Sequence, residues 1–177
     1  MTTARRAAPE AAPLIVVMGV SGCGKTSVGE LLAARLGVPY ADADGFHPPE
    51  SVAKMSAGTP LDDTDRAPWL DSIGAWLAAH AAGGGVVSCS ALKRRYRDRL
   101  AGFAPGAFFV HLDGSYELIA RRIARRTGHF MPESLLRSQF DDLEPLEAGE
   151  NGTTVPVDGS PEETTDRALA ELPVRPR

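Results

Sequence analysis

Residues 19–26 of the chain read Gly-Val-Ser-Gly-Cys-Gly-Lys-Thr, and this octapeptide decides how the rest of the sequence is interpreted. It matches the pattern G-x-x-x-x-G-K-T of a phosphate-binding loop, or P-loop. The apolar run Leu14–Met18 precedes it, and a stretch with helical character, Lys25–Leu36, follows it. A strand that leads through a glycine-rich turn into a helix directs backbone N–H groups and the positive end of the helix dipole at an anion.

The residues of this loop have predicted roles in nucleotide binding. Lys25 supplies a positive charge for the β- and γ-phosphates, and the Thr26 hydroxyl is suited to ligate Mg²⁺. We therefore expect ATP and Mg²⁺ as cofactors. The residues expected to bind ATP are Gly19, Val20, Ser21, Gly22, Cys23, Gly24, Lys25 and Thr26.

Composition and charge indicate an ordinary globular protein. The 177 residues are 43% hydrophobic and 24% charged, which suits one domain with its own core. A formal net charge of −4 argues against a general nucleic-acid binder, and no apolar run approaches the roughly 20 residues that span a membrane. The two cysteines, Cys23 and Cys89, are far apart, and we expect both to be reduced, as in a cytoplasmic protein.

Strand and helix signals alternate along the chain after a tail, residues 1–13, that we expect to be disordered and not a signal peptide. This alternation predicts a single domain, residues 14–177, with an α/β fold: a three-layer α/β/α sandwich around a mostly parallel five-stranded sheet. The predicted strands are 14–18, 39–41, 86–89, 108–112 and 154–157, and the predicted helices are 25–36, 49–57, 68–82, 93–100, 115–126, 132–140 and 161–172.

Ligands bind beyond the carboxyl ends of the strands in such a sheet, and polar residues follow three of them. The P-loop, residues 19–26, follows the first strand, Asp42 and Asp44 follow the second, and residues 90–93 follow the third. In an extended segment the two aspartates point to the same side. Asp42 is suited to organise the Mg²⁺ hydration shell and Asp44 to accept a proton from a substrate hydroxyl. The alternative for this pair is a solvated acidic turn.

Two predicted helices are rich in basic residues. Arg122 and Arg126 are four residues apart and share a helix face, and Arg126 precedes the breaker Thr127-Gly128. We expect a small lid at about residues 125–133 that brings this charge to a transferring phosphoryl group. Most of the other arginines are expected to be solvated, namely Arg94, Arg95, Arg99, Arg121 and Arg125.

The four histidines fall into two classes. His47 lies in a stiff turn before Pro48-Pro49, and His129 lies in the predicted lid. His80 and His111 are expected to be structural. The histidines and cysteines lack the spacing of a zinc site, and the chain has no G-x-S-x-G segment that would favour a hydrolase.

The motifs in this order resemble those of the gluconokinase family of small P-loop kinases. Residues 42–48 are similar to its D-x-D-x-x-H-P, residues 54–61 to its K-M-x-x-G-x-P-L, and residues 63–70 to its D-x-D-R-x-P-W-L. Residues 89–98 resemble C-S-A-L-K-x-x-Y-R-D, and residues 126–130, 139–140 and 143–144 complete the set. The resemblance spans about residues 14–158. Ser51 departs from it, because the family often has asparagine there.

The resemblance implies a fold like that of adenylate and shikimate kinases and transfer of phosphate from ATP to the 6-hydroxyl of D-gluconate. It also implies a homodimer. Asp44 would orient the hydroxyl, and Lys25, Arg122 and Arg126 would stabilise phosphoryl charge. Arg66 or Arg97 is favoured for the gluconate carboxylate. The substrate contacts implied are Asp44, His47, Lys54, Arg66, Lys93, Arg97 and His129.

Two alternatives remain open. A kinase of the same fold for another small hydroxy acid, such as shikimate, would share the P-loop and the aspartate pair without needing the block 54–70. A nucleotide-binding module without catalysis would share only the P-loop. A regulatory GTPase is disfavoured, because the chain's one asparagine, Asn151, is followed by Gly152 and does not form the N-K-x-D loop that reads guanine.

Overall fold

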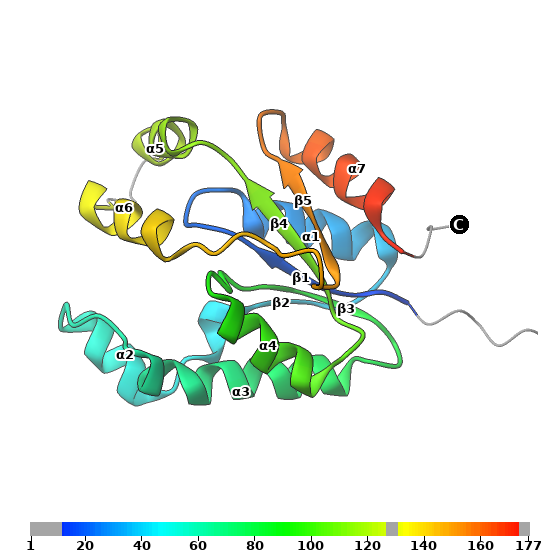
Figure 1. Cartoon of the computed structure of the whole chain (residues 1–177), viewed down its shortest axis with the longest axis horizontal. Helices are drawn as coiled ribbons and strands as arrows, with labels where there is room; N and C mark the ends of the chain where they lie inside the picture. Colours follow the sequence, from blue (N-terminus) through cyan, green and yellow to red (C-terminus); the bar gives the residue numbers. More distant parts are fainter. Residues whose placement is uncertain (1–11, 127–130, 174–177) are drawn as a thin grey trace, which may run out of the picture.

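The computed structural model of the chain describes residues 12–126 and 131–173. Most of the predicted tail and the predicted lid segment 127–130, which includes His129, lie outside the described residues. Figure 1 shows helices on both faces of a central sheet, so the predicted three-layer α/β/α architecture is confirmed.

The sheet has five parallel strands in the order β2-β3-β1-β4-β5. Strand β1, whose sequence is LIVVM, is central and buried along its whole length, as expected for a strand covered on both faces. All five strands were predicted to within about two residues. Their bounds are β1 Leu14–Met18, β2 Tyr40–Asp42, β3 Gly85–Ser88, β4 Phe108–Asp113 and β5 Gly152–Pro156.

Alternating side chains of β1 divide the core into two layers. Ile15 and Val17 pack with the helices at residues 25–36 and 161–171, whereas Val16 and Met18 pack with the helices at residues 63–79 and 94–103. Figure 1 shows these two helix pairs on opposite faces of the sheet. The helices are α1 Lys25–Leu36, α2 Pro49–Ser56, α3 Asp63–Ala79, α4 Arg94–Phe103, α5 Tyr116–Ala124, α6 Glu133–Asp142 and α7 Pro161–Glu171, with a short 3₁₀ helix, η1, at Ala43–Phe46.

Helix α3 is where the sequence-based bounds were most in error. It begins at Asp63, not at the predicted Pro68, and ends at Ala79, not at Ala82. A capping box starts it early, because the Asp62 carboxylate accepts from the Asp65 N–H at 2.8 Å and the Asp65 carboxylate accepts from the Asp62 N–H at 3.0 Å. Pro68 therefore lies inside the helix, although it was predicted to be the first helical residue.

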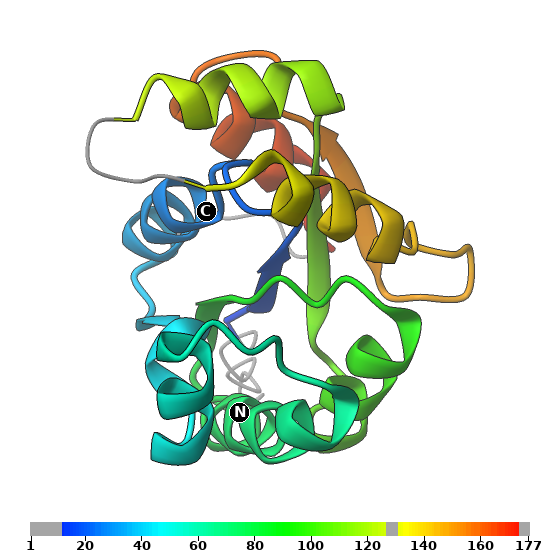
Figure 2. The ribbon, with the colours of Figure 1, turned by 90° about the vertical axis from the view of Figure 1, so that its left-hand side faces the viewer.

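The parallel register brings the carboxyl ends of β1, β2 and β3 to one edge of the sheet. The P-loop, η1 and residues 89–93 follow these three ends, as predicted. Figure 2 looks onto this edge, with α2 on one side of the P-loop and α5 and α6 on the other. In the part of the chain that the structure describes, no helix is long and apolar enough to cross a membrane.

Candidate active site

The P-loop turns sharply between β1 and α1 and begins the helix at Lys25. Gly22 and Gly24 have φ angles of +80° and +100°, which glycine adopts without strain. A Cβ atom added at Gly22 would lie 2.6 Å from Cγ1 of Ile123 on α5, whereas one added at Gly24 would meet no atom within 4 Å. The loop therefore packs closely against α5 at one point and borders open space at the start of α1.

The Lys25 ammonium stays close to the loop. Its Nζ donates hydrogen bonds to the carbonyl oxygens of Gly19 and Val20, each at 3.0 Å. These bonds hold the cation beside the turn whose backbone N–H groups would receive an anion.

Two polar residues that the sequence analysis did not single out support the base of the loop. Ser88 Oγ, on β3, donates to the Lys25 carbonyl at 2.9 Å and accepts from the Tyr40 hydroxyl at 2.9 Å. Burial raises the pKa of the Tyr40 hydroxyl, which therefore stays protonated as a donor. The Gly19 N–H donates to the Ser90 carbonyl at 3.2 Å, so β3 and the turn after it fix the loop at both ends.

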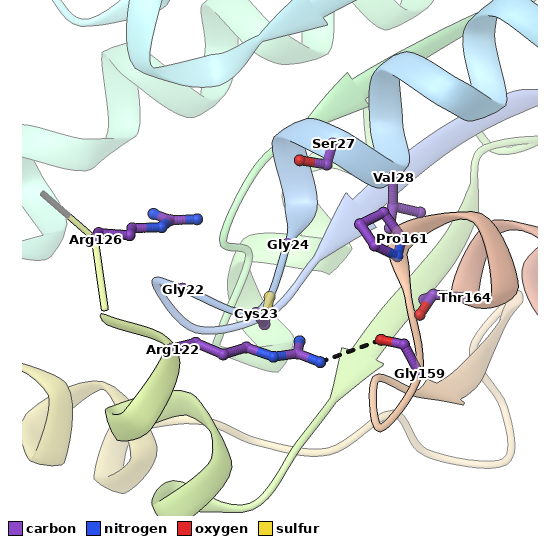
Figure 3. Close-up of a pocket in the computed structure, with 10 residues that line it drawn as sticks. All are labelled: Gly22, Cys23, Gly24, Ser27, Val28, Arg122, Arg126, Gly159, Pro161 and Thr164. Atoms are coloured by element: carbon purple, nitrogen blue, oxygen red, sulfur yellow. Dashed lines mark hydrogen bonds between the residues drawn. The ribbon is translucent and has the colours of Figure 1, made fainter. Parts of the chain in front are cut away.

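A cavity of about 270 Å³ adjoins the P-loop. Figure 3 shows Arg122 and Arg126 entering it from α5 and from the residues just after it. Arg122 donates to the carbonyls of Val157 and Gly159, in the turn between β5 and α7. The structure thus brings both predicted arginines to the phosphate loop. The cavity is lined by Gly22, Cys23, Gly24, Ser27, Val28, Arg122, Arg126, Gly159, Pro161 and Thr164.

Both cysteines are free, as expected, and each is about 1% exposed. Burial raises the pKa of the Cys23 thiol, and it raises that of Cys89 to about 12. Thiols with such raised pKa values stay protonated near neutral pH and are poor nucleophiles. Neither cysteine is a candidate for covalent chemistry.

The aspartate pair lies at the predicted edge, but the extended geometry expected for it is wrong. Asp42 ends β2, and its Oδ1 accepts from the Asp44 N–H at 2.9 Å, which makes Asp42 the cap of η1. Asp44 lies inside this 3₁₀ turn and is exposed. The short turn forms because an aspartate side chain readily bonds the backbone two residues on. Both carboxylates remain at the strand end next to β3.

His47 is held against the start of α3. Its ring stacks on Trp69 with centroids 4.6 Å apart, and Trp69 Nε1 donates to the Ala43 carbonyl at 2.7 Å. Among the described residues, nothing bonds the buried Nδ1 of His47. Burial lowers the pKa of this histidine, Asp44 partly opposes the shift, and Arg66 adds to it. Asp44 lies in η1, His47 follows the last residue of η1, and Arg66 is on α3, so two neighbouring elements bring these three side chains together.

Three further basic residues predicted for the substrate have anionic or aromatic neighbours. Arg66 Nη1 donates to the Tyr96 hydroxyl at 2.8 Å, and its other N–H groups have no acceptor in the described part of the chain. Lys54 Nζ lies 2.6 Å from the Asp65 carboxylate, and the hydrogen bond between them raises the pKa of Lys54. Lys93 Nζ lies 3.6 Å from the Asp142 carboxylate.

The contacts of Arg97 argue against its predicted role in binding the substrate carboxylate. Its side chain is 1% exposed, and its Nε and Nη2 donate to the Glu150 carboxylate at 2.6 and 3.0 Å. Nη1 donates to the carbonyls of Ala91 and Leu92 at 3.0 and 3.2 Å, in a turn where Ala91 has a φ of +42°. A guanidinium engaged in this way is not placed to receive a substrate carboxylate, so we no longer favour Arg97 for that contact.

His80 and His111 lie at the C-terminal end of α3 and in β4, apart from the P-loop cavity. The His80 ring stacks on Trp76, and its Nδ1 lies 2.8 Å from the Trp76 carbonyl. His111 is 3% exposed in β4, and burial lowers its pKa. Within residues 12–126 and 131–173, no three His, Cys, Asp or Glu side chains gather as they would around a metal ion.

One contact to the P-loop comes from a residue whose role the sequence analysis did not predict. Gln139 on α6 bonds both the backbone and the side chain of Ser21. The segment 139–144 was quoted only as part of the resemblance. Nothing in the local pattern of α6 indicates that this glutamine reaches a loop 118 positions earlier.

Comparison with known proteins places this site in context. The family model described as shikimate kinase matches residues 21–172. The chain is similar to the gluconokinase of Gluconobacter oxydans, with 49% identity over 160 residues that cover 89% of this chain and 88% of the relative. It is also similar to the crystal structure of a gluconokinase from Sinorhizobium meliloti, with a TM-score of 0.83, 50% identity and 90% of each chain covered.

A third similarity is limited to the fold. The shikimate kinase of Aquifex aeolicus matches with a TM-score of 0.59 over 88% of this chain and 93% of that one, but the identity is only 17%. The chain therefore shares both sequence and fold with gluconokinases, whereas it shares only the fold with this shikimate kinase.

Proposed function

The chain belongs to the gluconokinase family, and on this premise we propose that it phosphorylates D-gluconate at the 6-hydroxyl with ATP. The products are 6-phospho-D-gluconate and ADP. The observation that carries the proposal is the 49–50% identity to gluconokinases over about nine tenths of the chain. The alternative of shikimate has only the shared fold in its favour, at 17% identity.

The nucleotide phosphates would lie on the P-loop. The loop presents the N-terminus of α1, holds the Lys25 ammonium beside it and opens at Gly24. The adjoining cavity of about 270 Å³ would take part of the remaining nucleotide. Arg122 and Arg126 line this cavity, so both are suited to stabilise charge on the phosphoryl oxygens.

The oxygen donors at this edge suit Mg²⁺. Thr26 is exposed in the first turn of α1, and Asp42 uses one carboxylate oxygen to cap η1, whereas its other oxygen has no hydrogen-bond donor among the described residues and suits a bound water. A Mg²⁺ ion held here would supply positive charge that offsets part of the negative charge of the phosphates. Thr26 and Asp42 are the residues that we propose to hold it.

Gluconate would bind between η1 and the start of α3. Asp44 is proposed to orient the attacking hydroxyl and accept its proton, and His47, which lies beside Asp44, is proposed to contact another hydroxyl. Arg66 is proposed for the carboxylate, because within residues 12–126 and 131–173 its one side-chain hydrogen bond is the bond to Tyr96. Lys54 and Lys93 stay proposed contacts at the rim, next to Asp65 and Asp142.

Catalysis in this arrangement is mainly positioning and electrostatic stabilisation, since phosphoryl transfer asks little covalent chemistry of the protein. Asp44 holds the nucleophile, and Lys25, Arg122 and Arg126 surround the group that is transferred. We propose a homodimer on the basis of the family resemblance, and a cytoplasmic location on the basis of the two free cysteines.

The proposal is tested by measuring ADP release with Mg-ATP and a panel of acceptors: gluconate, other aldonates, glucose, shikimate and AMP. We expect strong turnover with gluconate alone. The Lys25→Ala variant should keep the fold and lose about 10²–10³-fold in kcat, as enzymes do when one transition-state donor is removed. Turnover with shikimate in place of gluconate would replace the substrate assignment. ATP binding without any acceptor-dependent turnover would favour a non-catalytic module.

A further inference from the structure

The segment 139–144 contacts two loops of the site, and the proposed chemistry uses none of its residues. At one end Gln139 Oε1 accepts from the Ser21 N–H at 2.7 Å, and Gln139 Nε2 donates to Ser21 Oγ at 3.0 Å. Both halves of the carboxamide are therefore bonded to a single P-loop residue. A backbone N–H can only donate, so the oxygen of the amide must face it, and the orientation of Gln139 is determined.

The other end of the segment holds the turn that follows β3. The Glu144 N–H donates to the Leu92 carbonyl at 2.8 Å, and the Glu144 carboxylate accepts from the Arg94 N–H at 2.5 Å, at the first residue of α4. This turn also carries the Ser90 carbonyl that accepts from the first P-loop glycine, Gly19. Glu144 thus supports the P-loop indirectly, through the turn.

The middle of the segment is anchored in the core. Phe140 packs edge-on against Tyr116 of α5, with centroids 5.5 Å apart, and Leu143 packs against both core layers. The side chain that reaches Ser21 therefore starts from a fixed helix. A glycine-rich loop has many accessible conformations, and holding its middle residue removes part of the ordering cost that a bound phosphate would otherwise meet.

We propose that Gln139 is a positioning residue of the phosphate loop. It fixes the Ser21 backbone, keeps the neighbouring N–H groups aimed at the phosphates, and joins the loop to α6. Its loss should weaken nucleotide binding and slow turnover while leaving gluconate binding unchanged. The turnover part of this inference rests on the proposed function, whereas the nucleotide-binding part does not.

The test replaces Gln139 by methionine, which has a similar length and no strong hydrogen-bonding groups. Ser138→Ala is the matched control, because Ser138 directly precedes Gln139 on α6 and is exposed. We expect Gln139→Met to raise the KM for ATP by about 5- to 100-fold, the range expected for losing two hydrogen bonds, and to lower kcat. The KM for gluconate should stay within about twofold, and Ser138→Ala should match the wild type.

A second readout does not need turnover. The thermal shift caused by Mg-ADP should be clearly smaller for Gln139→Met than for the wild type and for Ser138→Ala, at equal ligand concentration. If the wild type failed to phosphorylate gluconate, this shift would still test the inference. An unchanged shift together with an unchanged KM for ATP would overturn it, and so would an equal loss of gluconate affinity.

A double-mutant cycle identifies the contact itself. Ser21→Ala removes the hydroxyl but keeps the N–H that donates to Gln139 Oε1. Its effect on nucleotide binding should therefore be smaller than the effect of Gln139→Met. In the Gln139→Met background Ser21→Ala should add little, because the shared bond is already lost. Fully additive effects would overturn the assignment. Tighter nucleotide binding by Gln139→Met would do so as well, since it would mean that the carboxamide competes with a phosphate.

Discussion

The buried ion pair between Arg97 and Glu150 should be the most sensitive electrostatic feature of the fold. The two side chains are 1% and 6% exposed and share two hydrogen bonds of 2.6 and 3.0 Å. Glu150→Ala would leave the Arg97 charge buried without its partner, and such a loss costs about 3–5 kcal/mol of stability. For a domain of this size each kcal/mol lowers Tm by about 2–4 °C, so we expect a fall of roughly 6–20 °C.

Urea unfolding of the wild type, Glu150→Ala and the double variant Arg97→Met/Glu150→Leu would test this prediction. The double variant removes both charges and keeps apolar volume, so it should be clearly more stable than Glu150→Ala. A loss below about 1 kcal/mol in Glu150→Ala would refute the reasoning, because that is the cost of breaking an ion pair that water screens.

Acid titration gives an independent check on the same pair. Burial opposes ionisation of Glu150, but the hydrogen bonds from Arg97 and from the Glu147 N–H outweigh it, and the pKa of Glu150 lies below its usual value of 4.5. A carboxyl whose pKa is lower in the folded state contributes stability above pH 4.5 that is lost as the pH falls through the folded pKa. The stability difference between the wild type and Glu150→Gln should therefore shrink as the pH falls below that value.

Three further predictions concern the site and the sheet. Asp44→Asn should lower kcat by about 10²–10⁴-fold if Asp44 is the general base, and a loss under tenfold with an unchanged KM for gluconate would reduce it to a spectator. Arg126→Ala should lower kcat more than gluconate affinity, and an effect confined to the KM for gluconate would move Arg126 to the acceptor side. Burial lowers the pKa of His111 below 6.5, so stability should be greatest above that pH and should fall as the pH drops through the folded pKa. The His111→Phe variant should show a smaller dependence of the free energy of unfolding on pH, measured by urea unfolding between pH 5 and 8.

The sequence predicted the sheet and the P-loop well, because both depend on local signals. The run LIVVM and the glycine pattern after it need no distant partner to be recognised. The start of α3 was misplaced because Pro68 was read as the first helical residue, although the capping pair Asp62 and Asp65 lies just upstream. The aspartate pair was assigned an extended backbone because the bond from the Asp44 N–H to the Asp42 side chain was not considered.

The roles of polar residues were harder to predict, because they depend on distant partners. Arg97 has the residue type that a substrate carboxylate needs, but its guanidinium donates to the carboxylate of Glu150, 53 positions later in the chain. Gln139, Ser88 and Tyr40 support the loop through contacts that no periodicity indicates. Residue type alone predicted which side chains carry charge, and the tertiary contacts decide which of these charges are available to a ligand.

The order of the strands also bears on how copies of this chain can associate. The two outer strands are β2, with three residues, and β5, which ends at Pro156 and therefore lacks one backbone donor. Short strands and proline are features that discourage one sheet from adding to another edge to edge. The proposed dimer would therefore form through helical faces, and the sheet in each copy would keep its own five strands.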